Sequence, residues 1–216
     1  MNNLSFSRTE YRGAGTQRGL VLFFALIALV AMSLAALALV RSVDTSTLIS
    51  GNLAFRQAAT TSADGGVENS VAVMTAMQAA NDALATPKNV YLDATQIFNV
   101  TNAATGYYSN VDPTLDLFAT TTWVDGVSST ATTDNSGNTY RSVIQRMCRV
   151  ANQVVSKPNC LFSGAATDNS GKAVPLPSQI CAGPGCPAAG QSPQYRVTVR
   201  VTGPKNTISY IQAMVY

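Results

Sequence analysis

The residues best suited to chemistry are four cysteines in the last third of a 216-residue chain: Cys148, Cys160, Cys181 and Cys186. Such thiols form disulfides, stay free in a core, or bind zinc. Zinc sites use two close cysteine pairs, and only Cys181 and Cys186 approach that spacing. An even number in an exported domain favours two disulfides, and the sequence leaves all three pairings open.

Other catalytic groups are missing or are better explained as turns. The chain has no histidine, which excludes Ser-His and Cys-His pairs and histidine-based zinc sites. Asp112 and Asp116 flank Pro113, so this acidic pair predicts a turn rather than an acid–base pair. No Gly-rich phosphate loop is present. We therefore expect no enzymatic activity, no cofactor and no metal.

A repeated motif, Thr-Asp-Asn-Ser-Gly at residues 133–137 and 167–171, invites a calcium hypothesis. Calcium loops need further oxygen ligands at alternate positions and a terminal Glu, and neither copy has them. Turns closed by Asp and Asn side chains explain the same residues.

Charge is sparse, at 12% of residues with a formal net charge of +3, and the basic residues form no run. Nucleic-acid binding therefore has no electrostatic basis. The hydrophobic share of 46% suffices for one anchor and one modest domain.

The elements that position these residues begin with an apolar stretch at 20–40, which contains no charge, Pro or Gly. As a helix it would be roughly 31 Å long, enough to cross a bilayer. Arg8, Arg12 and Arg18 precede it against one acid, Glu10, which predicts a cytoplasmic N-terminus and an exported remainder. A cleaved secretory signal and a plain uncleaved anchor are alternatives.

Helical spacing continues beyond the apolar stretch as far as Pro87. Its apolar row is predicted to face a core and consists of Val67, Val71, Met74, Met77 and Leu84.

Strand patterns dominate the C-terminal part. Residues 195–202 alternate apolar and polar side chains, which predicts a strand with one buried and one wet face. A turn at 203–206 and a last strand at 207–216 follow. Leu115–Val124 and Tyr140–Val150 are further strand candidates. The fold predicted is α+β, with one long N-terminal helix packed on a small antiparallel sheet.

The junction from Gln17 to Leu20 resembles the processing site of type IV prepilins, because a basic leader ends in Gly directly before the apolar helix. The resemblance implies that prepilin peptidase cuts after Gly19 and that the new amine of Leu20 is methylated. Most pilins carry Glu as the fifth mature residue, where this chain has Phe24. PilX-type minor pilins and a tip pseudopilin of type II secretion also lack it.

Two further segments are similar to PilX-type minor pilins: Arg41-Ser42 followed by Gly51-Asn52 and Phe55–Ala59, and the C-terminal hairpin. Thr60 and Thr61 replace an acid that often follows the Ala-Ala pair. The domains expected are a leader at 1–19, a membrane or pilus-core helix at 20–41, an amphipathic helix at 42–86 and a globular domain at 87–216.

The resemblance implies a structural protein of the type IV pilus, in its tip or priming complex, acting in adhesion, motility or aggregation. The implied partners are prepilin peptidase, other minor pilins, the major pilin and a large tip adhesin. The implied locations are the inner membrane before assembly and the pilus afterwards. A type II secretion pseudopilin and an anchored exported protein unrelated to pili are the alternatives.

Overall fold

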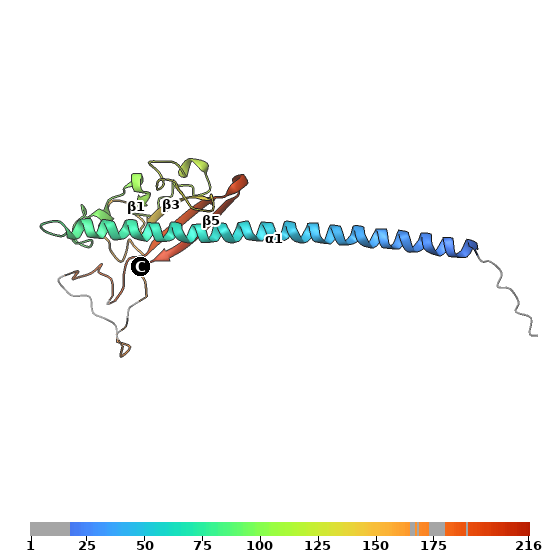
Figure 1. Ribbon diagram of the computed structural model, residues 1–216. Helices are drawn as coiled ribbons and strands as arrows, with labels where there is room; N and C mark the ends of the chain where they lie inside the picture. The colour runs from blue at the N-terminus through green and yellow to red at the C-terminus, as the bar shows by residue number, and fades with distance from the viewer. Residues whose placement is uncertain (1–17, 165–166, 168, 173–179, 189) are drawn as a thin grey trace, which may run out of the picture. The chain divides into compact units, whose positions relative to one another are not determined.

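The computed structural model describes residues 18–164, 167, 169–172, 180–188 and 190–216. The chain divides into two compact units, one ending at Asn52 and the other beginning at Leu53. A single helix, α1 (Arg18–Asp82), contributes residues to both units (Figure 1).

Helix α1 is unbroken over 65 residues because the chain contains no proline before Pro87. Interior glycines such as Gly51 lower helix propensity without interrupting it. The helix ends at Asp82, and the Asn81 amide closes this end. It donates to the Lys88 carbonyl at 3.1 Å and accepts from the Lys88 N–H at 3.2 Å. The long helix expected from the sequence is confirmed.

A five-stranded sheet belongs to the second unit, with the order β1-β3-β4-β5 and β2 paired to β3 (Figure 1). The strands are β1 (Tyr107–Tyr108), β2 (Thr132–Thr133), β3 (Thr139–Arg146), β4 (Tyr195–Thr202) and β5 (Ile208–Val215). The β3–β4 and β4–β5 pairs are antiparallel, and β1 runs parallel to β3. The α+β fold is confirmed, but the sheet is mixed rather than wholly antiparallel.

Short 3-10 helices interrupt the connecting segment (residues 83–138) and the final hairpin. They are η1 (Ile97–Asn99), η2 (Ala103–Thr105), η3 (Thr120–Thr122) and η4 (Pro204–Asn206). The predicted strand at Leu115–Val124 is wrong, because this stretch forms turns and η3. The Asp112 and Asp116 carboxylates accept from N–H groups two residues on, at 2.9 and 2.8 Å, and so stabilise turns instead.

The α1 face that contacts the sheet consists mainly of small residues. Ala59, Ala63 and Ser70 are buried there, with Met74 and Met77 further along. Val71 and Leu84, expected in this row, are 39% and 44% exposed. The predicted row is therefore confirmed for Met74 and Met77, which are buried, and for Val67, which packs against the core, and it is wrong for Val71 and Leu84. Closer to the middle of the helix, small side chains take over the contact because they allow closer approach to the sheet than large ones.

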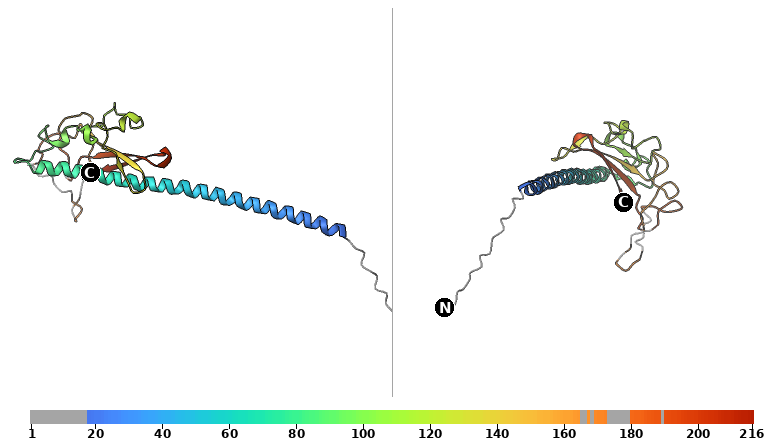
Figure 2. Two further views of the ribbon diagram at one scale, coloured as in Figure 1. Left: turned by 45° about the horizontal axis from the view of Figure 1, so that its top comes forward. Right: turned by 90° about the vertical axis from the view of Figure 1, so that its right-hand side faces the viewer.

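The face of β4 turned away from α1 is partly covered, in contrast to the wet face predicted for it. Val197, Val199 and Val201 are fully buried on the α1 side. Thr198, which alternates with them, is only 2% exposed on the other side. A second cluster, centred on Trp123 and Val143, covers that side with residues of the connecting segment. Figure 2 (right) shows the connecting segment on the side of the sheet away from the helix.

Candidate functional site

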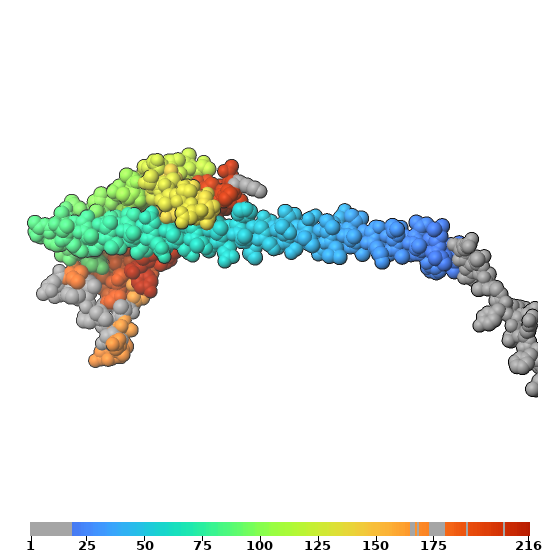
Figure 3. All heavy atoms as spheres, in the orientation of Figure 1, coloured from blue at the N-terminus to red at the C-terminus, as the bar shows by residue number. Residues whose placement is uncertain are grey.

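The N-terminal unit presents an exposed apolar helix. Every residue from Gly19 to Ser50 is solvent-exposed in the isolated chain (Figure 3). Among the described residues, α1 is the one helix that is long and apolar enough to cross a membrane. The Ser33 hydroxyl donates to the Leu29 carbonyl at 2.7 Å, so its polar group is satisfied within the helix, as a lipid environment requires.

Three sequence-predicted site residues lie in the first turns of this helix. Gly19 has open space around its Cα, and Leu20 is 53% exposed. Phe24 is 60% exposed, and its ring meets that of Phe23 edge-on at 6.4 Å between centroids. This part of the helix therefore offers an apolar surface. The rest of the expected leader, residues 1–17, lies outside the described residues.

The four cysteines form two disulfides, which confirms the prediction and settles the pairing. Cys148 pairs with Cys160, and Cys181 pairs with Cys186. Cys148 is 2% exposed and packs with Val155 in a small cluster of its own. The sequence could not choose the pairing because the described residues between β3 and β4 form turns and isolated bridges, which leave no regular spacing to read.

The Cys148–Cys160 disulfide lies just beyond β3, which ends at Arg146 rather than at the predicted Val150. Main-chain hydrogen bonds also hold the chain around this disulfide. The Arg149 N–H donates to the Asn159 carbonyl at 2.8 Å, and the Val111 N–H donates to the Cys148 carbonyl at 2.9 Å. The smaller disulfide loop is attached through Lys157 N–H, which donates to the Gly185 carbonyl at 2.7 Å. Together these bonds hold the irregular region against the sheet.

Arg146 is the residue that sequence reasoning missed. It is fully buried at the end of β3. Its guanidinium donates to the carbonyls of Ser109, Phe98 and Gln153 at 2.8–2.9 Å, and to the Asn99 side chain at 2.5 Å. Burial lowers the pKa of Arg146. The side chain thus joins two parts of the connecting segment to the chain that follows β3, and no sequence signal distinguishes it from exposed arginines.

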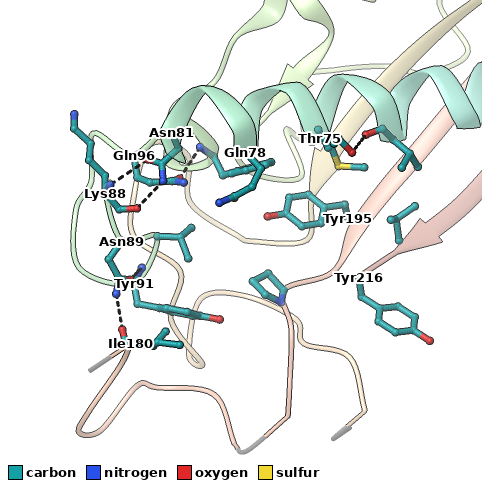
Figure 4. Close-up of a pocket in the computed structure, with 16 residues that line it drawn as sticks. Thr75, Gln78, Asn81, Lys88, Asn89, Tyr91, Gln96, Ile180, Tyr195 and Tyr216 are labelled. Atoms are coloured by element: carbon teal, nitrogen blue, oxygen red, sulfur yellow. Dashed lines mark hydrogen bonds between the residues drawn. The ribbon is translucent and has the colours of Figure 1, made fainter. Parts of the chain in front are cut away.

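A groove of about 580 Å³ opens between the C-terminal end of α1, the 88–91 segment and the end of β5 (Figure 4). Its lining includes Met74, Gln78, Tyr91, Tyr195 and Tyr216. Asn89 donates to the Ile180 carbonyl at 2.7 Å across one end. Of the described residues that line it, Lys88 alone has a charged side chain, so the groove offers apolar contact and mostly neutral hydrogen-bonding groups.

Two tyrosines of this groove keep their protons well into alkaline solution. Burial raises the pKa of Tyr195 to about 12, and burial also raises the pKa of Tyr91. Neither is poised to act as a base near neutral pH.

Metal chemistry has no geometric support in the described part of the chain, which contains no group of three or more potential ligands. The first Thr-Asp-Asn-Ser-Gly motif forms the expected turn. The Asp134 carboxylate accepts from the N–H groups of Ser136 and Asn138, each at 2.8 Å. The second motif lies partly outside the described residues.

The described residues thus provide an exposed apolar helix, two intramolecular disulfides and a groove whose lining is mostly uncharged. Comparison with models of protein families, with curated proteins and with solved structures found no match.

Proposed function

We propose that the chain is a minor pilin of the PilX type that takes part in the assembly of a type IV pilus. One observation carries the proposal. Helix α1 runs from Arg18 through the Gly19 junction, exposes apolar side chains from Leu20 to Val40, and continues without a break into the second unit, where it packs on a sheet. A cleaved signal peptide would not need such continuity.

The physical role of the helix follows from its surface. Before assembly, lipid would cover the apolar side chains from Leu20 to Val40. After processing, neighbouring anchor helices in the fibre would replace the lipid, so the apolar surface would stay out of water throughout. Small residues such as Ala28, Ala31 and Ala35 suit close helix approach.

Phe24 supports a position at or near the tip. A carboxylate at this place would pair with the N-terminal amine of a neighbouring subunit, whereas a phenyl ring forms no such pair. The missing pair would matter least at the leading end, where no subunit lies beyond. A large tip adhesin, other minor pilins and the major pilin are the partners this assignment implies.

The test is the N-terminus of the mature protein, measured by mass spectrometry of sheared fibres. We expect a chain that begins at N-methylated Leu20. Gly19→Val should leave the leader attached, whereas the matched change Gly51→Val should be processed normally, since neither glycine has a neighbour near the added Cβ.

An intact Met1 in the wild-type protein, or a start between Ser33 and Val40, would overturn the prepilin assignment. The first result would mean a plain anchor, and the second a secretory signal peptide.

A further inference from the structure

Strand β5 is the free edge of the sheet. It pairs with β4 over its whole length, from Tyr195↔Val215 to Thr202↔Ile208, without a bulge. The opposite edge is treated differently, since two short strands, β1 and β2, cover parts of β3. Only β5 therefore presents a long unpaired edge among the described strands.

The direction of the main-chain groups follows from the register. Gly203 N–H donates to Thr207 O at 2.8 Å, in line with the β4–β5 pairing. In an antiparallel strand, the N–H and C=O groups of every second residue point to the same neighbouring strand. The main-chain groups of residues 209, 211, 213 and 215 therefore point toward β4. The N–H and C=O groups of 208, 210, 212 and 214 then point outward. Within the described part of the chain, no hydrogen bond reaches them.

Edge strands are usually protected against pairing by charge, proline or a bulge. Residues 208–215 contain none of these. The outward residues also expose apolar side chains, with Ile208 and Met214 each 50% exposed. Tyr210 lies between them and is held by ring contacts to Phe118 and Trp123, at 5.6 and 5.9 Å between centroids.

Charge beside the edge indicates the kind of partner. Arg141 and Arg200 stand directly opposite each other on β3 and β4. Arg141 forms an ion pair with Asp125 at 2.7 Å, whereas no ion pair is formed by Arg200 or Arg196 within the described residues. Arg196 and Arg200 are therefore two cations on the strand next to β5. They favour an acidic partner and disfavour a second copy of this chain, which would bring the same cations.

We propose that β5 binds an extended segment of another protein, which adds to the sheet as a further strand and carries an acidic residue. The main-chain groups of 208, 210, 212 and 214 supply hydrogen bonds, and Ile208 and Met214 contact the apolar side chains of the added strand. The inference does not depend on pilus assembly, because it concerns only residues of the second unit.

The test uses the full chain in detergent micelles, with hydrogen exchange of its amides as the readout. The probe is a synthetic peptide of alternating Val and Thr with a central Glu, compared with the same peptide carrying Lys. When nine-tenths of the protein is bound by the Glu peptide, exchange at 208, 210, 212 and 214 should slow by about tenfold. The Lys peptide should slow it less.

A matched pair of variants tests the edge itself. Gln212→Pro removes one outward N–H while leaving the main-chain bonds to β4 intact, and Gln212→Thr keeps that N–H. Both variants lose the hydrogen bond that the Gln212 side chain donates to the Thr198 hydroxyl at 3.2 Å, so this loss is matched between them. Trp123 fluorescence verifies that each variant is folded. We expect Gln212→Pro to abolish the slowing and Gln212→Thr to retain it.

Three outcomes would overturn the proposal. Equal slowing of exchange by the Glu and Lys peptides would show that the partner's charge does not matter, and the assignment of an acidic partner would be wrong. Slowing that leaves the outward amides unchanged would place binding elsewhere. Slowing without peptide that grows with protein concentration would identify a second copy as the occupant.

Discussion

Gly66 lies where α1 packs closely on the sheet, whereas its neighbour Gly65 faces open space. A Cβ added at Gly66 would lie 2.6 Å from Val199 Cγ1 and 3.1 Å from Tyr140 Cδ2. A Cβ added at Gly65 would meet nothing within 4 Å. The changes Gly65→Ala and Gly66→Ala therefore differ in steric contact while sharing one helix interior.

The magnitudes follow from two opposing effects. Alanine favours a helix interior over glycine by about 1 kcal/mol, which applies at both positions. Overpacking a core costs about 1–3 kcal/mol, and it applies only at Gly66, where Val199 is β-branched and stiff. Gly65→Ala should stabilise by about 1 kcal/mol. The free energy of unfolding of the Gly66→Ala variant should be lower than that of the Gly65→Ala variant by about 1–3 kcal/mol.

The assay is urea unfolding of the full chain in detergent micelles, followed by tryptophan fluorescence. Trp123 is the single tryptophan of the sequence and is 4% exposed, so its signal reports on the second unit. Equal stabilisation by the two variants would show that the helix does not approach the sheet this closely, and the reasoning would be refuted.

Three further changes test other parts of the fold by the same unfolding assay. Arg146→Met leaves buried carbonyls without a donor and should cost about 3–5 kcal/mol, whereas Arg149→Met, at an exposed residue, should change little. An equal effect of the two would contradict the role of the buried guanidinium. Gly106→Ala should destabilise the protein more than Gly126→Ala. Both glycines have φ near +80°, but only at Gly106 would an added Cβ lie 2.6 Å from a backbone atom, the Ser129 nitrogen. Equal losses of stability would leave the strain of a positive φ as the only cause. Burial raises the pKa of Tyr195 to about 12, so the folded protein holds this proton more tightly than the unfolded chain; stability should fall as pH rises from about 10 to about 12, and Tyr195→Phe should reduce that fall.

Elements with a strong repeating pattern were predictable from the sequence. The absence of proline before Pro87 predicted α1, and the alternation in residues 195–202 predicted β4 with its returning partner. The number of cysteines predicted two disulfides, but pairing depends on how an irregular chain folds in space. These features follow from local spacing, which a single sequence contains.

Features that depend on contacts between distant segments were not predictable. Leu115–Val124 has the composition of a strand, yet the carboxylates of Asp112 and Asp116 stabilise turns around it. Val71 and Leu84 fit the helical period of a core row, but close approach of α1 selects small residues such as Gly66 instead. Arg146 is surrounded by carbonyl groups that only the folded connecting segment brings together.

The order of the sheet also governs when the protein can fold during its synthesis. Strand β4 lies between β3 and β5, so β3 has its main partner only after the chain has grown through Thr202. Until then, α1 faces no β4, and Val143 and Ile144 have only part of their final surroundings. The C-terminal residues therefore complete the core last, and a chain truncated before Tyr195 would lack Val197, Val199 and Val201, on which α1 packs.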